Sequence, residues 1–411
     1  MAPTAEKLAA LLRESLVLIL AGGEGQRLYP LTRARAKPAV RFGGAYRIID
    51  FTLSNCLNSG LRRIYLMTQY AATPLQRHLR TGWSPLLAEE LGEFIEMLPP
   101  QRLFADHWYA GTADAVFQNL MVLQDERPAR VFLLAGDHIY KMDYGELLAR
   151  HEATGAELTV ACVPRPREEA RHFGVMQVDA EGRVIGFQEK PAEPAPLPGQ
   201  PDCCLVSMGV YLWDTEALVR KVAADATRDS SHDFGKDIIP EMVAAQEPVY
   251  AYFFSDSEGA PAYWRDIGTL DGYWAATLDL VRPLPELDLY DPHWPVYGSR
   301  RRRPPAKIVA GAKLSVADSL LAPGCIVSGA TVHSSVLSPG VVVQEGAVVL
   351  ESIIMDDAVI GAGAQVHRAI LDEGVRVPPG YHIGVDPDHD RRRFVVTDSG
   401  IVVVPSGAMV D

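Results

Sequence analysis

The chain lacks the features that mark a thiol, membrane or nucleic-acid-binding protein. Its five cysteines include no Cys-x-x-Cys pair, and the neighbours Cys203 and Cys204 are poorly placed for an ordinary disulfide, so reduced, structural thiols are predicted. No apolar run approaches the ~18 residues of a membrane span. The stretch up to Ser15 carries charges of both signs, which is unlike a signal peptide and predicts a short amphipathic helix.

An excess of positive charge is also missing. The formal net charge is -13, which disfavours general attraction to nucleic acid or to an anionic membrane. We therefore predict a cytoplasmic protein without a nucleic-acid or membrane partner. Any anionic ligand must then be bound by local clusters of Arg and Lys.

A glycine-rich junction near the N-terminus is the first motif with chemical content. Leu16–Leu20 predicts a buried parallel strand. The glycines that follow within four positions are Gly22, Gly23 and Gly25. Such a loop lets backbone N–H groups approach an anion, and Arg27 and Lys37 supply cations. The loop lacks the Gly-Lys-Ser/Thr ending of a P-loop, and Leu28 stands where a dinucleotide fingerprint has its third glycine. On the loop alone, a glycine turn with exposed charges fits equally well.

Two carboxylates extend this motif. Val131–Ala135 predicts a second buried strand, which leads into Gly136 and Asp137. Strands that alternate with helical segments predict an α/β fold with a mostly parallel sheet, whose ligand lies beyond the carboxyl ends of the strands. A carboxylate at that edge commonly binds Mg²⁺ beside phosphates, and Asp266 is the second candidate. Each aspartate alone fits a turn or a helix cap better, but together with the loop they suggest metal-assisted nucleotidyl transfer.

The C-terminal part of the chain has a different period. A proline-rich stretch at 283–306, with the run Arg300–Arg303, predicts a solvated interdomain linker between a catalytic domain at 1–282 and a second domain at 307–411. In the second domain, aliphatic residues recur every six positions in three series: Leu320, Ile326, Val332; Val336, Val342, Val348, Ile354, Ile360, Val366; and Leu371, Val377, Ile383. This step predicts a left-handed parallel β-helix with one inward aliphatic residue per face and altered turns after 332 and 366. An antiparallel meander is the alternative, but meanders do not keep a fixed hexad.

Short motifs throughout the first domain resemble the sugar-1-phosphate nucleotidylyltransferases, most closely the bacterial branch that makes ADP-glucose. The matching segments are 20–28, 35–40, 42–44, 47–51, 54–56, 68–70, 108–114, 135–140, 173–176, 189–191, 207–209, 231–237 and 263–269. They span the catalytic domain in order, and a hexapeptide domain follows as in that family. The resemblance implies a Rossmann-like nucleotidyltransferase sheet, followed by a β-helix that serves oligomerisation and regulation.

The implied reaction is Mg²⁺-dependent transfer of AMP from ATP to α-D-glucose 1-phosphate. It gives ADP-glucose and pyrophosphate for glycogen or another α-glucan. The same chemistry with another nucleotide or sugar phosphate stays open, because base choice depends on loop shape. A non-catalytic regulatory subunit is disfavoured, since the phosphate and metal residues are all present. A hexapeptide acyltransferase is also disfavoured, because the β-helix histidines look scattered: His333, His367 and His382.

The resemblance also assigns site residues. Asp137 and Asp266 would bind Mg²⁺, Arg27 and Lys37 would steady the triphosphate, and Lys190 would bind glucose 1-phosphate. The other implied substrate-binding residues are Gly22, Gly23, Gly25, Gln69, Tyr109, Gly111, Gly174, Glu189, Ser207, Asp233, Phe234 and Trp264. Because in-line attack needs positioning and charge neutralisation, no nucleophilic role is expected for His107, His138 or a cysteine.

Regulation and assembly are implied as well. The family places an anionic effector between its two domains, and the basic residues implied here are Arg35, Arg41, Arg47, Arg392 and Arg393. The chain departs from the pattern at Ala34, where some members use a lysine for a sugar-bisphosphate activator, and its C-terminal tail lacks their basic end. Regulation by an anionic metabolite is therefore expected, while fructose 1,6-bisphosphate is in doubt. Since the family is typically tetrameric, a homotetramer is expected.

Overall fold

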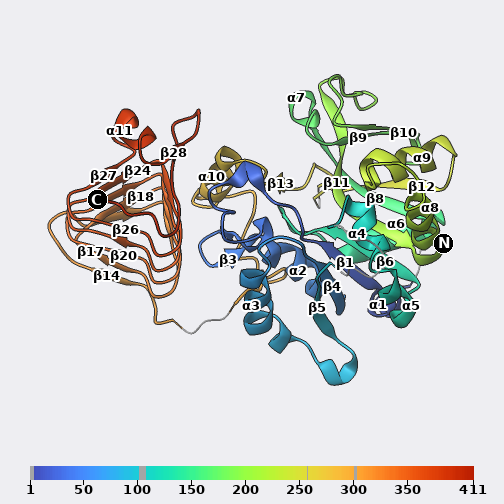
Figure 1. The fold of residues 1–411 in the computed structure, drawn as a ribbon, viewed down its shortest axis with the longest axis horizontal. Helices are drawn as coiled ribbons and strands as arrows, with labels where there is room; N and C mark the ends of the chain where they lie inside the picture. Colours follow the sequence, from blue (N-terminus) through green and yellow to red (C-terminus); the bar gives the residue numbers. More distant parts are fainter. Residues whose placement is uncertain (1–3, 101–107, 257, 300–302) are drawn as a thin grey trace.

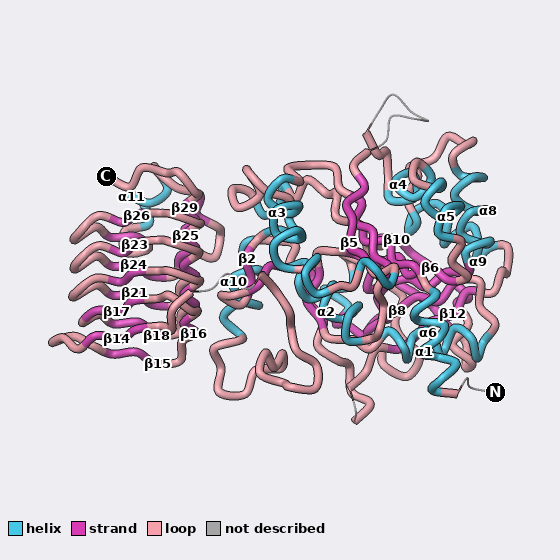
Figure 2. Tube along the Cα trace, turned by 90° about the horizontal axis from the view of Figure 1, so that it is seen from below, coloured by secondary structure: helices cyan, strands magenta, loops and turns pink. Residues whose placement is uncertain are grey.

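A computed structural model describes residues 4–100, 108–256, 258–299 and 303–411 of the chain. An α/β domain and a β-helix lie side by side (Figures 1 and 2). The predicted fold class is therefore confirmed. Part of the Arg300–Arg303 run lies outside the described residues, as does His107. Among the described residues, every helix is too short or too polar to span a lipid bilayer.

The first domain is built on a mixed sheet in the order β10-β9-β11-β6-β1-β4-β5; off this path, β8 pairs with β11, and β12 pairs with β8. Strands β6, β1, β4 and β5 run parallel, as do β8 and β12, whereas β11 is antiparallel to its neighbours. The strands of this domain are β1 Leu16–Leu20, β2 Arg41–Phe42, β3 Tyr46–Arg47, β4 Arg63–Met67, β5 Phe94–Leu98, β6 Arg130–Ala135, β7 His138–Tyr140, β8 Leu158–Pro166, β9 Gly174–Val178, β10 Val184–Glu189, β11 Cys203–Asp214, β12 Val249–Phe253 and β13 Trp264–Asp266.

Helices cover both faces of this sheet. Along β1, Leu16 and Leu18 pack into one apolar core, while Val17 and Ile19 pack into the core on the opposite face. This alternation explains why the strand is apolar throughout. The helices are α1 Ala5–Glu14, α2 Ile48–Asn58, α3 Thr73–Gly82, α4 Thr112–Phe117, α5 Leu120–Glu126, α6 Tyr144–Thr154, α7 Arg167–Ala170, α8 Thr215–Asp225, α9 Ile239–Ala244, α10 Leu270–Asp279 and, in the second domain, α11 Pro387–Arg391. Single-turn helices are η1 Gln26–Leu28, η2 Lys37–Ala39, η3 Ser84–Leu86, η4 Glu89–Leu91 and η5 Phe234–Ile238.

The second domain is a three-faced parallel β-helix. Its faces are the strand stacks β14-β17-β20-β23-β26, β15-β18-β21-β24-β27 and β16-β19-β22-β25-β29-β28. The strands are β14 Lys307–Val309, β15 Ser315–Ala317, β16 Leu320–Leu321, β17 Ile326–Ser328, β18 Thr331–His333, β19 Val336–Leu337, β20 Val342–Val343, β21 Val348–Leu350, β22 Ile353–Ile354, β23 Val359–Ile360, β24 Gln365–His367, β25 Ala369–Leu371, β26 Arg376–Val377, β27 His382–Ile383, β28 Val395–Val396 and β29 Val402–Val404.

The strict hexad is wrong for the first coils of this β-helix. Val342 pairs with Val359, and Val359 with Arg376, a step of 17 residues that is one fewer than three hexads, whereas Ile326 pairs with Val342, a step of only 16. One face therefore takes a five-residue step. From Ile354 onward the predicted aliphatic residues do point inward, as does Val332, but at four other earlier positions the inward residue lies one position later: Val327, Leu337, Val343 and Val349.

The third face of the β-helix packs against the first domain. Ile353, Ile370 and Val403 share an apolar cluster with Phe42 and Tyr273 of the first domain. Val336, predicted to point into the β-helix, is instead buried toward this interface, near Gly44. The segment between α10 and β14 packs on α2 through three hydrogen bonds, from Trp294 Nε1 to Asn55, from Asn58 to the Pro295 carbonyl, and from the Tyr297 N–H to Ser54.

Candidate active site

A cavity of about 830 Å³ opens where β1, β4 and β6 end. Its wall contains the glycine loop, an aspartate just after β6, the aspartate that ends β13, and loops from the antiparallel half of the sheet. The ends of parallel strands thus position the cavity, as the α/β pattern predicts.

The glycine loop turns tightly because of Gly25. Its φ of 63° lies in the left-handed region, and a Cβ there would lie 2.9 Å from Thr32 Cγ2 and 3.1 Å from Lys37 Cβ. The Thr32 hydroxyl donates a hydrogen bond to the Gly25 carbonyl at 3.0 Å, and η1 follows at once. Only glycine meets both demands, so this residue brings the loop beside Lys37.

The two carboxylates meet through a small second sheet. Strand β7 begins directly after Asp137, and it pairs with β13 so that Asp266 lies opposite His138. This pairing brings together two aspartates that are 129 residues apart in the chain. It places both aspartates in the cavity wall.

Lys37 lies between these carboxylates. Its Nζ donates to Asp137 Oδ2 at 2.8 Å and to Asp266 Oδ1 at 3.0 Å. Burial alone would lower the pKa of Lys37, but the two carboxylates outweigh it and raise that pKa above its ordinary value. Burial would raise the pKa of Asp137, yet Lys37 and His138 hold it well below its usual range. Lys37 and Asp137 therefore both carry charge at neutral pH.

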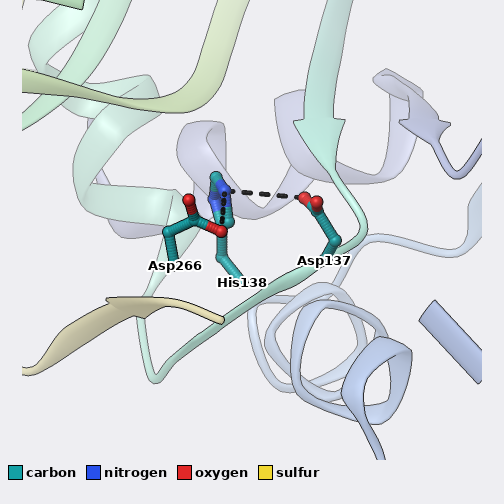
Figure 3. A group of neighbouring side chains, drawn as sticks. All are labelled: Asp137, His138 and Asp266. Atoms are coloured by element: carbon teal, nitrogen blue, oxygen red, sulfur yellow. Dashed lines mark ion pairs between the residues drawn. The ribbon is translucent and has the colours of Figure 1, made fainter. Parts of the chain in front are cut away.

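His138 completes the acidic group (Figure 3). Its Nδ1–H donates to the Met208 carbonyl at 3.0 Å, which directs Nε2 toward Asp137 at 3.5 Å and Asp266 at 3.8 Å. One ligand atom from each of the three side chains lies within 4.8 Å of the others. Two carboxylates and an imidazole held by a backbone carbonyl form a donor set that suits a divalent cation.

The far side of the cavity is lined by the end of the β9–β10 hairpin. Glu189 ends β10, and its carboxylate lies 3.2 Å from Lys190 Nζ. Lys190 has a left-handed φ of 45° and a side chain that is 61% exposed. Strain in a non-glycine residue is typical of a functional position, and the exposed ammonium is available to a phosphate.

A polar turn at η5 forms the neighbouring wall. Asp233 Oδ1 accepts hydrogen bonds from the N–H groups of Gly235 and Lys236, while Oδ2 accepts one from Thr112. The Thr112 hydroxyl in turn accepts from the Phe234 N–H at 3.1 Å. Nearby, Asn119 donates to the Tyr109 hydroxyl at 3.0 Å. These bonds fix the side chains that line this wall.

The structure brings most of the predicted site residues into one cavity wall. These residues are Gly22, Gly23, Gly25, Arg27, Lys37, Gln69, Tyr109, Gly111, Asp137, Gly174, Glu189, Lys190, Ser207, Asp233, Phe234 and Asp266. Trp264 is the exception and does not line the cavity. It is only 2% exposed and packs behind the wall against Phe173 and His138, because its large apolar ring belongs to the core.

Sequence reasoning missed other lining residues. Tyr211 lines the cavity with Ser207 and Gly209, at alternate positions of β11. The period of two along this strand was the signal that could have found it. His138, for which no nucleophilic role was expected, bonds a backbone carbonyl and also faces both aspartates.

The predicted effector residues divide into two groups. Arg35, Arg41 and Arg47 lie at the interface between the domains, where Asp372, Asp356 and Glu373 of the β-helix face them; the contacts are Arg35–Asp372 at 2.8 Å, Arg41–Asp356 and Arg47–Glu373 at 3.5 Å. Burial, together with Arg41, lowers the pKa of Arg47 to about 10. Burial also raises the pKa of Asp356 and Asp372.

The other two effector residues lie apart from this cluster. Arg393 contacts Tyr381 and Asp411 within the β-helix domain, and Arg392 is exposed after α11. The contacts that the structure records for residue 393 do not include the interface arginines. Arg393 thus bonds residues of its own domain, whereas Arg35, Arg41 and Arg47 contact acidic residues across the interface.

Comparison with known proteins places both halves of the chain. Residues 16–282 match the family model "Nucleotidyl transferase", and residues 304–404 match "GlmU-like, C-terminal hexapeptide". "Glucose-1-phosphate adenylyltransferase 2" of Alkalilimnicola ehrlichii is 49% identical over 406 residues, which cover 98% of this chain and 96% of that protein. "Glucose-1-phosphate adenylyltransferase" of Paramagnetospirillum magneticum is 50% identical, covering 96% and 94%. Its namesake in Paraburkholderia phytofirmans is 47% identical, covering 99% of both chains.

The fold, the acidic pair and the glycine loop thus define a nucleotidyl transferase with a C-terminal hexapeptide domain. Identity near one half extends over almost the full length of these relatives. The chain belongs to the glucose-1-phosphate adenylyltransferase family.

Proposed function

We propose that the cavity transfers the adenylyl group of ATP to glucose 1-phosphate, giving ADP-glucose and pyrophosphate. The observation that carries this proposal is the convergence of Lys37 on Asp137 and Asp266 beside the glycine loop. Nucleotidyl transfer needs cations that neutralise the phosphates and carboxylates that bind a metal ion, and a cationic loop next to paired carboxylates supplies both. The names of the relatives support the choice of ATP and glucose 1-phosphate.

The phosphate end of the cavity would bind the triphosphate. The backbone of Gly22, Gly23 and Gly25 and the side chain of Arg27 line this end of the wall. The donor set of Asp137 and Asp266 fits Mg²⁺, which prefers oxygen ligands and would supply charge neutralisation at the reacting phosphates. His138 is available as a further ligand through Nε2.

The sugar end would bind the acceptor. Lys190 would pair with the phosphate of glucose 1-phosphate, and Glu189, Ser207 and Asp233 offer acceptors for sugar hydroxyls. A phosphate oxygen of glucose 1-phosphate attacks the α-phosphorus of ATP, forming a new P–O bond. The bond between the α-phosphorus and the bridging oxygen breaks, and pyrophosphate leaves with its electron pair. Arg27 and Lys37 neutralise the charge on that leaving group.

Cysteine chemistry has no part in this proposal. The five cysteines are free, and the cavity wall contains none of them among its described residues. Burial raises the pKa of the Cys325 thiol to about 11 and raises those of Cys56 and Cys162 further. These thiols stay protonated at neutral pH.

The interface arginines support the predicted regulation by an anionic metabolite. Arg41 Nε and Arg47 Nε are buried donors without a hydrogen-bond acceptor among the described residues. An anion that reached them would satisfy both donors and compete with Glu373 and Asp356 for the guanidinium groups. The domain division at 282 and 307, the cytoplasmic location and the homotetramer remain predictions; the particle mass in solution tests the last of these.

A substrate screen tests the proposed reaction. Purified full-length protein is incubated with Mg²⁺, each of ATP, UTP, dTTP, CTP and GTP, and each of several sugar 1-phosphates, and pyrophosphate release is followed. We expect release with ATP and glucose 1-phosphate and much slower release with the other pairs. Release only with UTP or dTTP would assign the cavity to a different nucleotide, and no release with any pair would overturn the proposed function.

A further inference from the structure

We propose that Lys37 is a competing cation for the metal site: its ammonium and a divalent cation are alternative partners of the Asp137–Asp266 pair. The metal would then bind firmly only when the Lys37 ammonium pairs with the phosphates of the nucleotide and no longer with the two carboxylates. This inference rests on the proposed function for the identity of the metal site. It adds an order of binding, in which firm metal binding requires the nucleotide.

The contacts of Lys37 carry the proposal. One Nζ donates to an oxygen of each carboxylate, at 2.8 and 3.0 Å. The side chain of Lys37 is 9% exposed, compared with 61% for Lys190 in the same cavity. A buried ammonium that bridges two carboxylates neutralises half of their joint charge and uses one oxygen of each.

The backbone of Lys37 favours this position. The residue begins η2, where Pro38 fixes the next backbone angle, and its carbonyl accepts a hydrogen bond from the Val40 N–H at 3.0 Å. Lys37 also lies close to the glycine loop: a Cβ added at Gly25 would be 3.1 Å from the Cβ of Lys37. The ammonium is thus within reach of both the carboxylates and the loop that would cradle phosphate.

Competition follows from charge and ligand number. A divalent cation held by both carboxylates would lie close to the Lys37 ammonium, which already bonds one oxygen of each, and two cations so close together repel each other strongly in a partly buried site. Phosphate groups resolve the conflict, because they are strong acceptors for a lysine ammonium. Metal affinity and nucleotide affinity are therefore coupled through one side chain.

The experiment measures Mn²⁺ binding to the full-length protein without nucleotide, by electron paramagnetic resonance of the free ion. Lys37→Met should bind Mn²⁺ about tenfold or more tightly than the wild type, since close charge pairs couple by at least that factor. Lys190→Met is the matched control: it removes the same charge from the same cavity, but its ammonium contacts Glu189 and not the aspartate pair. Its Mn²⁺ affinity should equal that of the wild type.

Two further variants decide between explanations. Lys37→Gln should also bind more tightly than the wild type, and it provides a second route if the methionine variant does not fold. Adding Asp137→Asn to Lys37→Met should abolish the gain. Equal Mn²⁺ affinity in the wild type and both Lys37 variants would overturn the proposal, as would a gain that survives Asp137→Asn. These are binding readouts, so they stand apart from the substrate screen: the screen can fail while the competition holds, and the reverse.

Discussion

Close contact between two loops leaves no room for a side chain at Gly111. A Cβ built there overlaps the carbonyl oxygens of Ser231 and His232, on the loop that presents Asp233. The Ala113 N–H also donates to the His232 carbonyl at 2.8 Å, which ties the two loops together. Gly111 therefore allows the cavity wall to close, although nothing in its own local sequence requires a glycine.

Gly111→Ala is expected to displace the 231–233 loop. The overlap should lower stability by about 1–3 kcal/mol and weaken substrate binding, because Asp233 moves with the loop. Gly23→Ala is the control for stability, since a Cβ there has nothing within 4 Å. Thermal unfolding and KM for glucose 1-phosphate check the prediction, and an unchanged melting temperature for Gly111→Ala would contradict it.

At the residue scale, the sequence could predict the chemistry but not the contacts. Asp137 was identifiable because of its residue type and its place after a predicted strand, and Asp266 as a second candidate carboxylate. Their meeting depends on the pairing of β7 with β13, two three-residue strands with no pattern of their own. The bridge through Lys37 depends on that pairing too, and so it was not predictable. Trp264 was misplaced because a motif does not tell whether a ring faces a cavity or the core.

At the scale of elements, long strands and the β-helix were predictable, whereas the inward register of the first coils was not. A 17-residue coil and an 18-residue triple hexad differ by one residue. Where two aliphatic residues are adjacent in the sequence, either one could point inward, so the sequence does not fix the register. Val342 and Val343 are an example: a hexad favours the first, but the second is fully buried in the β-helix core. Only the strand pairings distinguish the two.

A pair of aspartate substitutions tests this register. Val343→Asp would bury an unpaired charge and should cost about 3–5 kcal/mol, or unfold the β-helix. Val342→Asp points away from the core and should cost far less. Thermal unfolding followed by circular dichroism compares the two variants. Equal losses of stability in the two variants, or a larger loss for Val342→Asp, would contradict the inward position of Val343 and favour the strict hexad.

At the scale of the whole molecule, one short segment serves both the domain interface and the cavity. Arg35 and Arg41 contact Asp372 and Asp356 of the β-helix, while Lys37 between them contacts the acidic pair in the cavity. Only a few residues of backbone therefore separate the interface contacts from Lys37 in the cavity. The domain order was predictable, but this shared segment required the packing of the β-helix face against Phe42 and Tyr273.

Arg35→Ala is expected to weaken this interface. It would leave Asp372, which is 2% exposed, without its cationic partner, at a cost of about 3–5 kcal/mol. Arg220→Ala removes an arginine whose side chain is 53% exposed and pairs with Glu157, so its cost should be about 0–1 kcal/mol. Adding Asp372→Asn to Arg35→Ala should restore part of the loss. Chemical unfolding measures all three variants, and equal costs for Arg35→Ala and Arg220→Ala would contradict the interface role.

The proposed reaction depends on the acidic pair Asp137 and Asp266. The rate of ADP-glucose formation by Asp137→Asn measures that dependence. The substitution keeps the size of the side chain and should leave the melting temperature near that of the wild type, because the carboxylate is 34% exposed. With ATP, glucose 1-phosphate and saturating Mg²⁺, the rate is expected to fall by about 10²-fold or more. Asp229→Asn, an exposed position outside the cavity wall, should keep the wild-type rate. A folded Asp137→Asn protein that forms ADP-glucose at nearly the wild-type rate would contradict the account.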